Sequence, residues 1–338
     1  MTNLLTQMLT THDVLLADGA TGTNLFNMGL MAGDAPELWN DEHPDRIRKL
    51  YQGAVDAGSD LFLTNSFGGN ASRLKLHGAE KRAHELSRIA AEIGREVSDK
   101  SDRKVIVAGS VGPTGDIMEP VGTLSHSDAV EMFHEQADGL KSGGADVLWL
   151  ETISAPEEYR AAAEGFALAD IDWCGTMSFD TAGRTMMGMT SADMVKMVEK
   201  LPNAPLGFGA NCGTGASDLL RTVLGFKAQG TERPVIAKGN AGIPKYVDGH
   251  IHYDGTPELM ADYAEMARNC GATIIGGCCG TMPDHLRHMR DALDSRPRAT
   301  PPTLEAITLA LGAFSSATDG TGDNEPAARS TRRRRARA

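Results

Sequence analysis

The feature that most constrains the fold of this chain is an alternation between short apolar runs and longer amphipathic stretches, repeated eight times. The apolar runs have the length of strands, and their near-continuous apolar character is typical of strands buried on both faces. The amphipathic stretches have the length and spacing of helices that cover a sheet. The eight predicted strands lie at residues 14–21, 60–67, 104–112, 146–153, 173–180, 205–213, 234–242 and 273–281.

Eight strand–helix units in succession predict an α/β fold, a single (β/α)8 TIM barrel with right-handed crossovers between parallel strands. We expect the barrel to occupy residues 1–295. From about Arg296 onward Pro, Ser, Gly and charged residues dominate, and we expect residues 296–338 to be a mostly disordered tail. Within it, residues 303–314 could form one short helix. The Arg-rich end is interpreted as a solvated segment, with contact to nucleic acid or to an acidic partner as the alternative.

Charge and composition exclude several classes of protein. The formal net charge is −12 although the last ten residues hold six Arg, so the rest of the chain is strongly acidic and nucleic acid is not expected as a partner. The N-terminus does not resemble a signal peptide, and no apolar run has membrane-spanning length. Five cysteines suggest no disulfide framework. We therefore expect a cytoplasmic protein that binds no membrane.

The predicted barrel brings distant residues to one rim, because active sites in this fold lie at the carboxyl ends of the strands. Read in order, these ends carry Asp18 and Gly19, Asn65 to Phe67, Ser110, Glu151, Asp180, Asn211 and Cys212, Asn240, and Cys278 with Cys279. Three of the five cysteines thus converge. The other two, Cys174 and Cys270, lie near a strand start and at a helix end, and we expect them to be packing or surface residues.

Three convergent thiols suit Zn²⁺, which accepts cysteine sulfur and leaves a fourth position for substrate when the protein supplies three ligands. The glycines of GGCCGT, residues 276–281, would let the backbone turn so that Cys278 and Cys279 reach the same ion. The spacing alone leaves a second interpretation open, in which the cysteine pair is a set of small buried apolar residues at a strand end.

Six motifs resemble those of the homocysteine S-methyltransferase family. They are ADGATGT (17–23), TNSFGGN (64–70), GSVGP (109–113), ETI (151–153), GANCG (209–213) and GGCCGT (276–281), in the same order and at the same strand positions. The resemblance covers about residues 10–295. It implies a zinc-dependent barrel that transfers a methyl group to the sulfur of homocysteine and forms methionine.

The resemblance also implies roles for single residues. Cys212, Cys278 and Cys279 become the zinc ligands and the catalytic centre, with one zinc per chain. Asp18 and Glu151 become the partners of the substrate ammonium, as charge-assisted hydrogen bonds require. Further substrate contacts are expected at Gly19, Ser110 and Phe67. In relatives of the corrinoid type, a residue that matches Asn240 fills the fourth zinc position, whereas a turn-forming role for Asn240 stays open.

The methyl donor is less constrained. Betaine-using members enclose the donor with aromatic side chains, but Gly68 and Thr152 stand here where those members carry Tyr, and Trp39 remains as a single candidate wall. The motifs are more similar to the homocysteine module of cobalamin-dependent methionine synthase. The hypothesis is a stand-alone homocysteine-activating component that receives methyl from a methylcorrinoid protein. Betaine and S-methylmethionine are alternative donors. A zinc-storage or redox protein is the non-enzyme alternative, although it would not need Asp18 and Glu151 on the rim.

Overall fold

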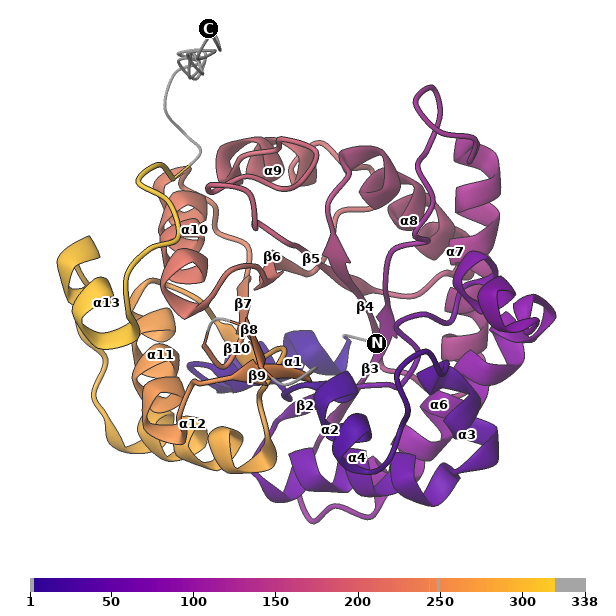
Figure 1. The fold of residues 1–338 in the computed structure, drawn as a ribbon, viewed down its shortest axis with the longest axis horizontal. Helices are drawn as coiled ribbons and strands as arrows, with labels where there is room; N and C mark the ends of the chain where they lie inside the picture. Colours follow the sequence, from indigo (N-terminus) through magenta and orange to yellow (C-terminus); the bar gives the residue numbers. More distant parts are fainter. Residues whose placement is uncertain (1–2, 243, 248–249, 320–338) are drawn as a thin grey trace, which may run out of the picture.

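The computed structural model describes residues 3–242, 244–247 and 250–319, and these form the (β/α)8 barrel that the alternation predicts (Figure 1). The eight barrel strands are parallel to their neighbours and run in the order β1-β10-β7-β6-β5-β4-β3-β2. Their bounds are β1 Leu15–Leu16, β2 Leu61–Leu63, β3 Ile106–Val111, β4 Val147–Ile153, β5 Trp173–Met177, β6 Gly207–Cys212, β7 Val235–Gly239 and β10 Ile274–Gly277. Each strand falls inside the range expected from the sequence.

Helices surround this sheet, most of them as an outer ring, while α1 lies at one end of the barrel (Figure 1). Their bounds are α1 Leu4–Thr11, α2 Thr21–Asn27, α3 Trp39–Glu42, α4 Pro44–Asp56, α5 Ala71–Leu74, α6 Ala83–Asp99, α7 His126–Ser142, α8 Pro156–Ala169, α9 Ser191–Val198, α10 Ala216–Ala228, α11 Pro257–Asn269, α12 Pro283–Ser295 and α13 Leu304–Leu311. Several of them begin with a capping side chain or with Pro in the first turn, as sequence rules for helix starts require.

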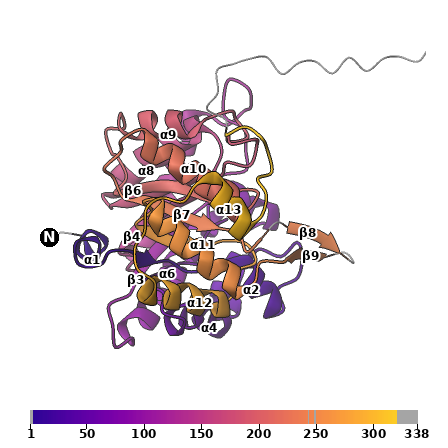
Figure 2. The same cartoon turned by 90° about the vertical axis from the view of Figure 1, so that its left-hand side faces the viewer.

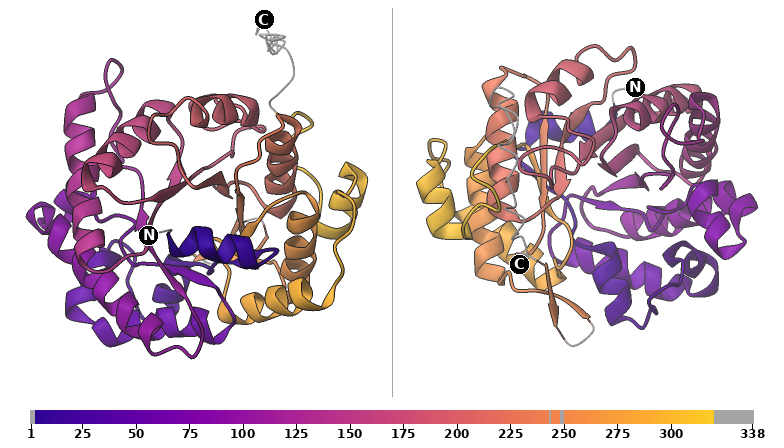
Figure 3. Two further views of the ribbon diagram at one scale, coloured as in Figure 1. Left: turned by 180° about the vertical axis from the view of Figure 1, so that it is seen from behind. Right: turned by 45° about the horizontal axis from the view of Figure 1, so that its top comes forward.

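Two apolar layers hold the barrel together. Outward-facing strand residues such as Trp173 and Phe208 pack against helical residues such as Phe166 and Phe226. A second cluster fills the barrel interior and continues into Leu5 of α1. Figure 2 shows α1 at one end of the barrel, and the left view of Figure 3 shows it lying across that end. The opposite end, where the strands finish, is therefore the face that is left for a site.

The sheet order does not join β1 to β2 directly, and two acidic side chains bridge this seam. The Leu16 amide donates to Asp60 Oδ2 at 2.8 Å, and the Asp60 amide donates to Leu16 O at 2.6 Å. Nearer the rim, the Leu63 amide donates to Asp18 Oδ2 at 2.8 Å. Side-chain carboxylates thus replace part of the missing backbone ladder.

An antiparallel hairpin, β8 Pro244–Val247 and β9 His250–Tyr253, projects from the rim between β7 and α11 (Figure 2). This hairpin was not expected from the sequence. The signal was present, because an Asp-Gly pair at 248–249 stands between the two strands and is a strong hairpin marker. Residues 248–249 themselves lie outside the described residues.

The segment after residue 295 differs from the expected disorder over its first part. Residues 296–319 cross the outside of α11 and α10, and α13 buries Ile307 and Leu311 there (Figures 1 and 3). Arg296 forms ion pairs with Asp262 and Glu265 of α11. The short helix expected within 303–314 is confirmed. The Arg-rich end, at residues 320–338, lies outside the described residues. Across the described part of the chain, no helix is both long enough and apolar enough to cross a bilayer.

Candidate active site

Three thiols meet at the carboxyl end of the barrel. Cys212 ends β6, and Cys278 and Cys279 follow β10 directly. Cys212 Sγ lies 2.9 Å from Cys278 Sγ and 3.6 Å from Cys279 Sγ, and all three sulfurs lie within 4.8 Å of one another. Cys174 and Cys270 are buried elsewhere in the apolar core, as expected of packing residues. The structure therefore brings together the three cysteines that the strand ends single out.

The backbone at the cysteines adopts conformations that few residues tolerate. Cys212 has φ +57°, which is strained for a residue with a side chain, and Gly213 follows at φ +73°. Gly280 has φ +79°, and a Cβ there would overlap the ring of Tyr253 from β9. The loop after Cys279 can thus approach the hairpin only with glycine at position 280.

Hydrogen bonds among the thiols distribute their protons unequally. The pKa of Cys279 is lowered because the Cys212 and Cys278 thiols donate to its sulfur. The pKa of Cys212 is raised by its hydrogen bonds with the Cys278 and Cys279 sulfurs and by burial. The hydroxyl of Tyr253 also hydrogen-bonds Cys279. Three thiols at such short separations resemble a site in which a cation would displace their protons.

Asn211 connects the thiol cluster to the end of β4. Its Nδ2 donates to Thr152 Oγ1 at 2.8 Å and lies 3.8 Å from Cys278 Sγ. Its Oδ1 accepts from the Thr152 amide at 2.8 Å, where Thr152 has φ +63°. Sequence reasoning placed Asn211 on the rim but gave it no role. The structure makes it a link between Cys278 and the strand end that carries Glu151.

Asn240 joins the two cysteine loops. Its Nδ2 donates to Gly213 O at 3.0 Å, and its Oδ1 accepts from the Cys279 amide at 3.1 Å. The amide oxygen that one of the two interpretations assigned to a fourth metal position is thus engaged by the backbone of a cysteine loop. These contacts favour a structural role, in which Asn240 acts as a clamp that holds the ends of β6 and β10 together.

Glu151 lies buried below the thiols with one defined partner. Ser110 Oγ donates to Glu151 Oε1 at 2.5 Å. The pKa of Glu151 is raised to about 7, chiefly by burial and to a smaller extent by the charges of Cys278 and Asp18, although Lys238 and the Ser110 hydrogen bond oppose the rise. The charged form of such a carboxylate is stabilised when an ammonium group binds beside it. This is the environment expected for a partner of an amino-acid substrate.

Asp18 is held differently, because a lysine that sequence reasoning missed lies beside it. Lys238 of β7 is buried, and its Nζ donates to Asp18 Oδ1 at 2.5 Å. Since Asp18 Oδ2 accepts from the Leu63 amide, both oxygens of Asp18 have protein partners. Lys238 Nζ also lies 5.9 Å from the centre of the Trp149 ring. The signal for Lys238 was a single cation inside an apolar strand that is buried on both faces.

The other residues that were expected near the substrate or the donor contact neighbouring protein groups. The Ser110 amide donates to Thr64 Oγ1 at 2.9 Å, so this N–H is not free to bind a substrate carboxylate. Gly19 packs against the backbone of Thr281, where a Cβ at position 19 would meet the carbonyl oxygen at 2.6 Å. Phe67 lies against Gly112. Trp39 is buried next to His43 and Arg46, away from the cysteines' strands.

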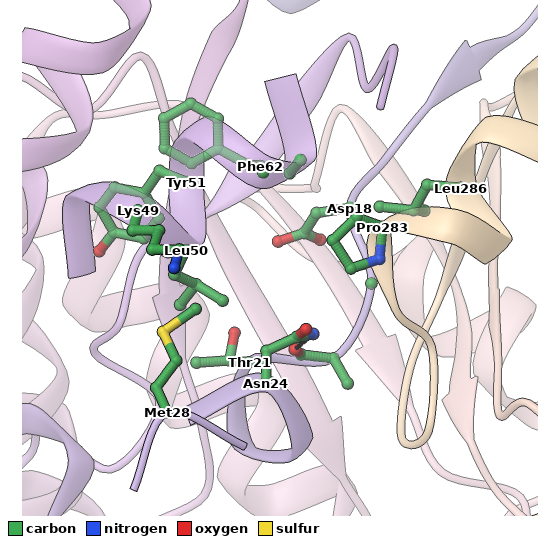
Figure 4. A pocket seen from close by; sticks show the side chains of 14 residues that line it. Asp18, Thr21, Asn24, Met28, Lys49, Leu50, Tyr51, Phe62, Pro283 and Leu286 are labelled. Carbon is green, nitrogen blue, oxygen red and sulfur yellow. Dashed lines mark hydrogen bonds between the residues drawn. The ribbon is translucent and has the colours of Figure 1, made fainter. Parts of the chain in front are cut away.

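A small cavity of about 40 Å³ lies behind Asp18, outside the barrel sheet. Figure 4 shows Asp18 with Tyr51 and Phe62 on one side and Pro283 and Leu286 on the other. None of the three clustered cysteines lines it. Its volume suits a few water molecules and not an amino acid. A substrate would therefore reach the thiols from the rim.

Comparison with known proteins adds three findings. The sequence model of a family described as homocysteine S-methyltransferase matches residues 15–293. Methionine synthases of Mycobacterium tuberculosis and Mycobacterium leprae are each 30% identical in an alignment of 299 residues that covers 83% of this chain and 24% of theirs. The chain thus spans about a quarter of the length of these curated relatives.

The third finding concerns solved structures. The homocysteine methyltransferase MmuM from Escherichia coli superposes in its metallated form with a TM-score of 0.71 at 24% identity, covering 87% of this chain and 99% of that one. Its oxidized form gives 0.72 at 23% identity, with 86% and 99% covered. At these identities, the likeness supports the barrel fold.

Proposed function

The chain belongs to the homocysteine S-methyltransferase family, and from this premise we propose that it methylates the sulfur of homocysteine with the help of one Zn²⁺ held by Cys212, Cys278 and Cys279. The observation that carries the proposal is the cluster of three thiols within 4.8 Å at the barrel rim. The metallated state named for the Escherichia coli homologue of this fold is consistent with it.

The residues present fit such an ion. Zinc–sulfur bonds of about 2.3 Å at tetrahedral angles put sulfurs about 3.8 Å apart, and the 3.6 Å between Cys212 Sγ and Cys279 Sγ is close to this value. Cys278 would move outward, because its sulfur lies 2.9 Å from that of Cys212. Three thiol ligands leave a position for substrate. When bound, Zn²⁺ supplies a Lewis acid that keeps a substrate thiol deprotonated near neutral pH.

The chain's own residues bind and orient homocysteine. Glu151 would accept the substrate ammonium on the oxygen that Ser110 does not occupy. Lys238 holds Asp18 and balances negative charge beneath the thiols. In the reaction, the substrate sulfur donates an electron pair to the methyl carbon and forms an S–CH₃ bond. The bond between that carbon and the donor breaks, and its electron pair leaves with the donor.

For the donor, we propose a methylcorrinoid carried by a protein domain other than this barrel. Betaine would need aromatic walls close to the thiols. Trp39 and Phe179 are buried in other contacts, Phe179 against Phe226, and Tyr253 is the aromatic side chain that hydrogen-bonds a clustered cysteine. The glycines that follow β2 in FGGNAS are buried, Gly68 against Glu37 and Gly69 against Gln136, and they supply no aromatic wall for a small cation.

The test is methionine formation by zinc-loaded protein, with homocysteine and with methylcobalamin, betaine or S-methylmethionine in turn. We expect about one zinc per chain and turnover with methylcobalamin. Cys278→Ala combined with Cys279→Ala should lose both the metal and the activity, and Cys270→Ala is the matched control that should keep them. Full zinc in the double variant would remove the proposed site. Turnover with betaine alone would reassign the donor. Zinc binding without turnover for any donor would favour a storage protein.

A further inference from the structure

The segment after α13 lies against the helix that follows Cys212. We call residues 312–316 the C-terminal strap. α13 anchors it through Ile307 and Leu311, which are buried in the main apolar core. The strap then runs along α10, near the top of the barrel in Figure 1. It lies beyond residue 293, where the match to the family model ends.

Four polar or ring contacts fasten the strap to the first two turns of α10. Ser217 Oγ donates to Gly312 O at 2.7 Å, and Arg221 Nη1 donates to Ser316 O at 2.9 Å. The Arg221 guanidinium lies 4.4 Å from the centre of the Phe314 ring. The Ser315 amide donates to Asp218 Oδ2 at 2.9 Å. The strap is thus held by both backbone and side chain.

Asp218 connects the strap to the loop that follows Cys212. It is buried, and it is paired with Arg221 at 2.8 Å. Its Oδ2 accepts from the Ser315 amide and also from Thr214 Oγ1, at 2.9 Å in each case. Thr214 Oγ1 lies 3.2 Å from Ser315 Oγ as well. One carboxylate therefore joins the strap to a residue that lies two positions after Cys212.

The loop needs such support, because its conformation is costly. Cys212 and Gly213 both have positive φ, and for Cys212 this costs on the order of 1 kcal/mol or more. Asn240 holds Gly213 O from the barrel side. On the helix side, the contacts of Thr214 run to Asp218 and Ser315. The loop is thus fixed from two directions.

We propose that the C-terminal strap is a positioning element for the metal site, which holds Cys212 in its strained conformation through Asp218 and Thr214. The inference rests on the proposed function, in that the thiols bind zinc. Partners that orient metal ligands in this way typically contribute 10- to 100-fold in metal affinity. Loss of the strap should therefore weaken zinc binding before it unfolds the barrel.

The experiment compares two truncations of the full chain. One ends at Leu311 and removes the strap. The other ends at Asp319 and removes only residues 320–338. Zinc affinity is measured by competition with a chromophoric chelator, and the Co²⁺-loaded proteins are compared by their thiolate charge-transfer absorption. We expect the chain ending at Leu311 to bind zinc at least about 10-fold more weakly, with a shifted Co²⁺ spectrum. The chain ending at Asp319 should match the full chain.

Point variants keep the test valid if the shorter truncation does not fold. Thr214→Val removes the hydroxyl that reaches Asp218 and should weaken zinc, whereas Thr214→Ser should restore the affinity. Thr222→Val, on α10, is the matched control, because the Thr222 hydroxyl donates to the helix backbone at Asp218 O. Unchanged affinity in both Thr214→Val and the chain ending at Leu311 would overturn the inference. Absence of zinc from the full chain would instead overturn the proposed function.

Discussion

At the scale of single residues, we expect Glu151 to determine how substrate binding depends on pH. Its pKa is raised to about 7 by burial, so the carboxyl is mostly protonated below that pH and charged above it. A charged carboxylate is needed to attract the substrate ammonium. The KM for homocysteine should therefore rise as the pH falls through about 7, and this rise should fade above pH 8.

Glu151→Gln tests this expectation. The variant loses a charge-assisted hydrogen bond of about 1.5–3 kcal/mol, which corresponds to a KM about 10- to 100-fold higher at pH 8. Its KM should no longer change near pH 7. In Ser110→Ala the carboxylate loses the hydroxyl that stabilises it, so the pH dependence should move to higher pH. If Glu151→Gln keeps the pH dependence of the wild type, another group is responsible.

The site residues also differ in how far the sequence could predict them. The three cysteines could be grouped because each one ends or follows a predicted strand, and parallel strand ends share one rim. Asp18 was expected to contact the substrate, yet its carboxylate is paired with Lys238, which lies 220 positions away. No local pattern states which acid a buried lysine will meet. The pairing of Asp18 with Lys238 depends on the register of β1 with β10 and of β10 with β7.

At the scale of elements, the ends of β6 and β10 are held together by Asn240 from the end of β7. The side chain donates to Gly213 O and accepts from the Cys279 amide. This contact could not be derived from KGNAG, because both partners are backbone groups of other loops. The β8–β9 hairpin is the opposite case, because its Asp-Gly marker is a local signal. The residues on either side of this marker form no apolar run of the kind that predicted the barrel strands.

Two substitutions separate the roles considered for Asn240. If it is a clamp, Asn240→Asp should weaken zinc binding, because the carboxylate would face Gly213 O without a proton to donate. If its oxygen is a metal ligand, the same change should strengthen binding, since carboxylate is a better zinc ligand than amide. We expect a decrease, with Asn240→Ala lower still, by about 10-fold or more. Chelator competition measures both variants, and tighter binding by Asn240→Asp would contradict the clamp.

At the scale of the whole molecule, the two ends of the barrel have different roles, one in closing the fold and the other in holding the thiol cluster. One end is covered by α1 (Figure 2). Asp60 lies at this end, at the seam between β1 and β2, while the other end carries the thiols. The alternation of strands and helices predicted this architecture but not how the ring closes. β1 contains two residues and β2 three, so few backbone bonds are available at the seam. The carboxylates of Asp60 and Asp18 supply hydrogen-bond acceptors that the short strands lack.

Asp60 should therefore matter for folding and not for metal binding. Its Oδ2 accepts from the Leu16 amide and from Arg290 at 3.2 Å, and its Oδ1 lies 3.6 Å from Arg103. Asp60→Ala leaves a buried amide and a partly buried guanidinium without this partner, at a cost of about 2–4 kcal/mol. For a chain of this length that corresponds to a fall in Tm of roughly 3–6 °C.

The matched control is Asp45→Ala, because Asp45 pairs with Arg48 while its side chain is 96% exposed. Exposed pairs contribute little, so its Tm should stay close to that of the wild type. Zinc content should be unchanged in both variants, since the seam residue and the thiols lie at opposite ends of the barrel. Calorimetry and metal analysis on the same samples give both quantities. An Asp60→Ala protein as stable as Asp45→Ala would mean that the backbone bond from Asp60 to Leu16 closes the ring without help from the carboxylate.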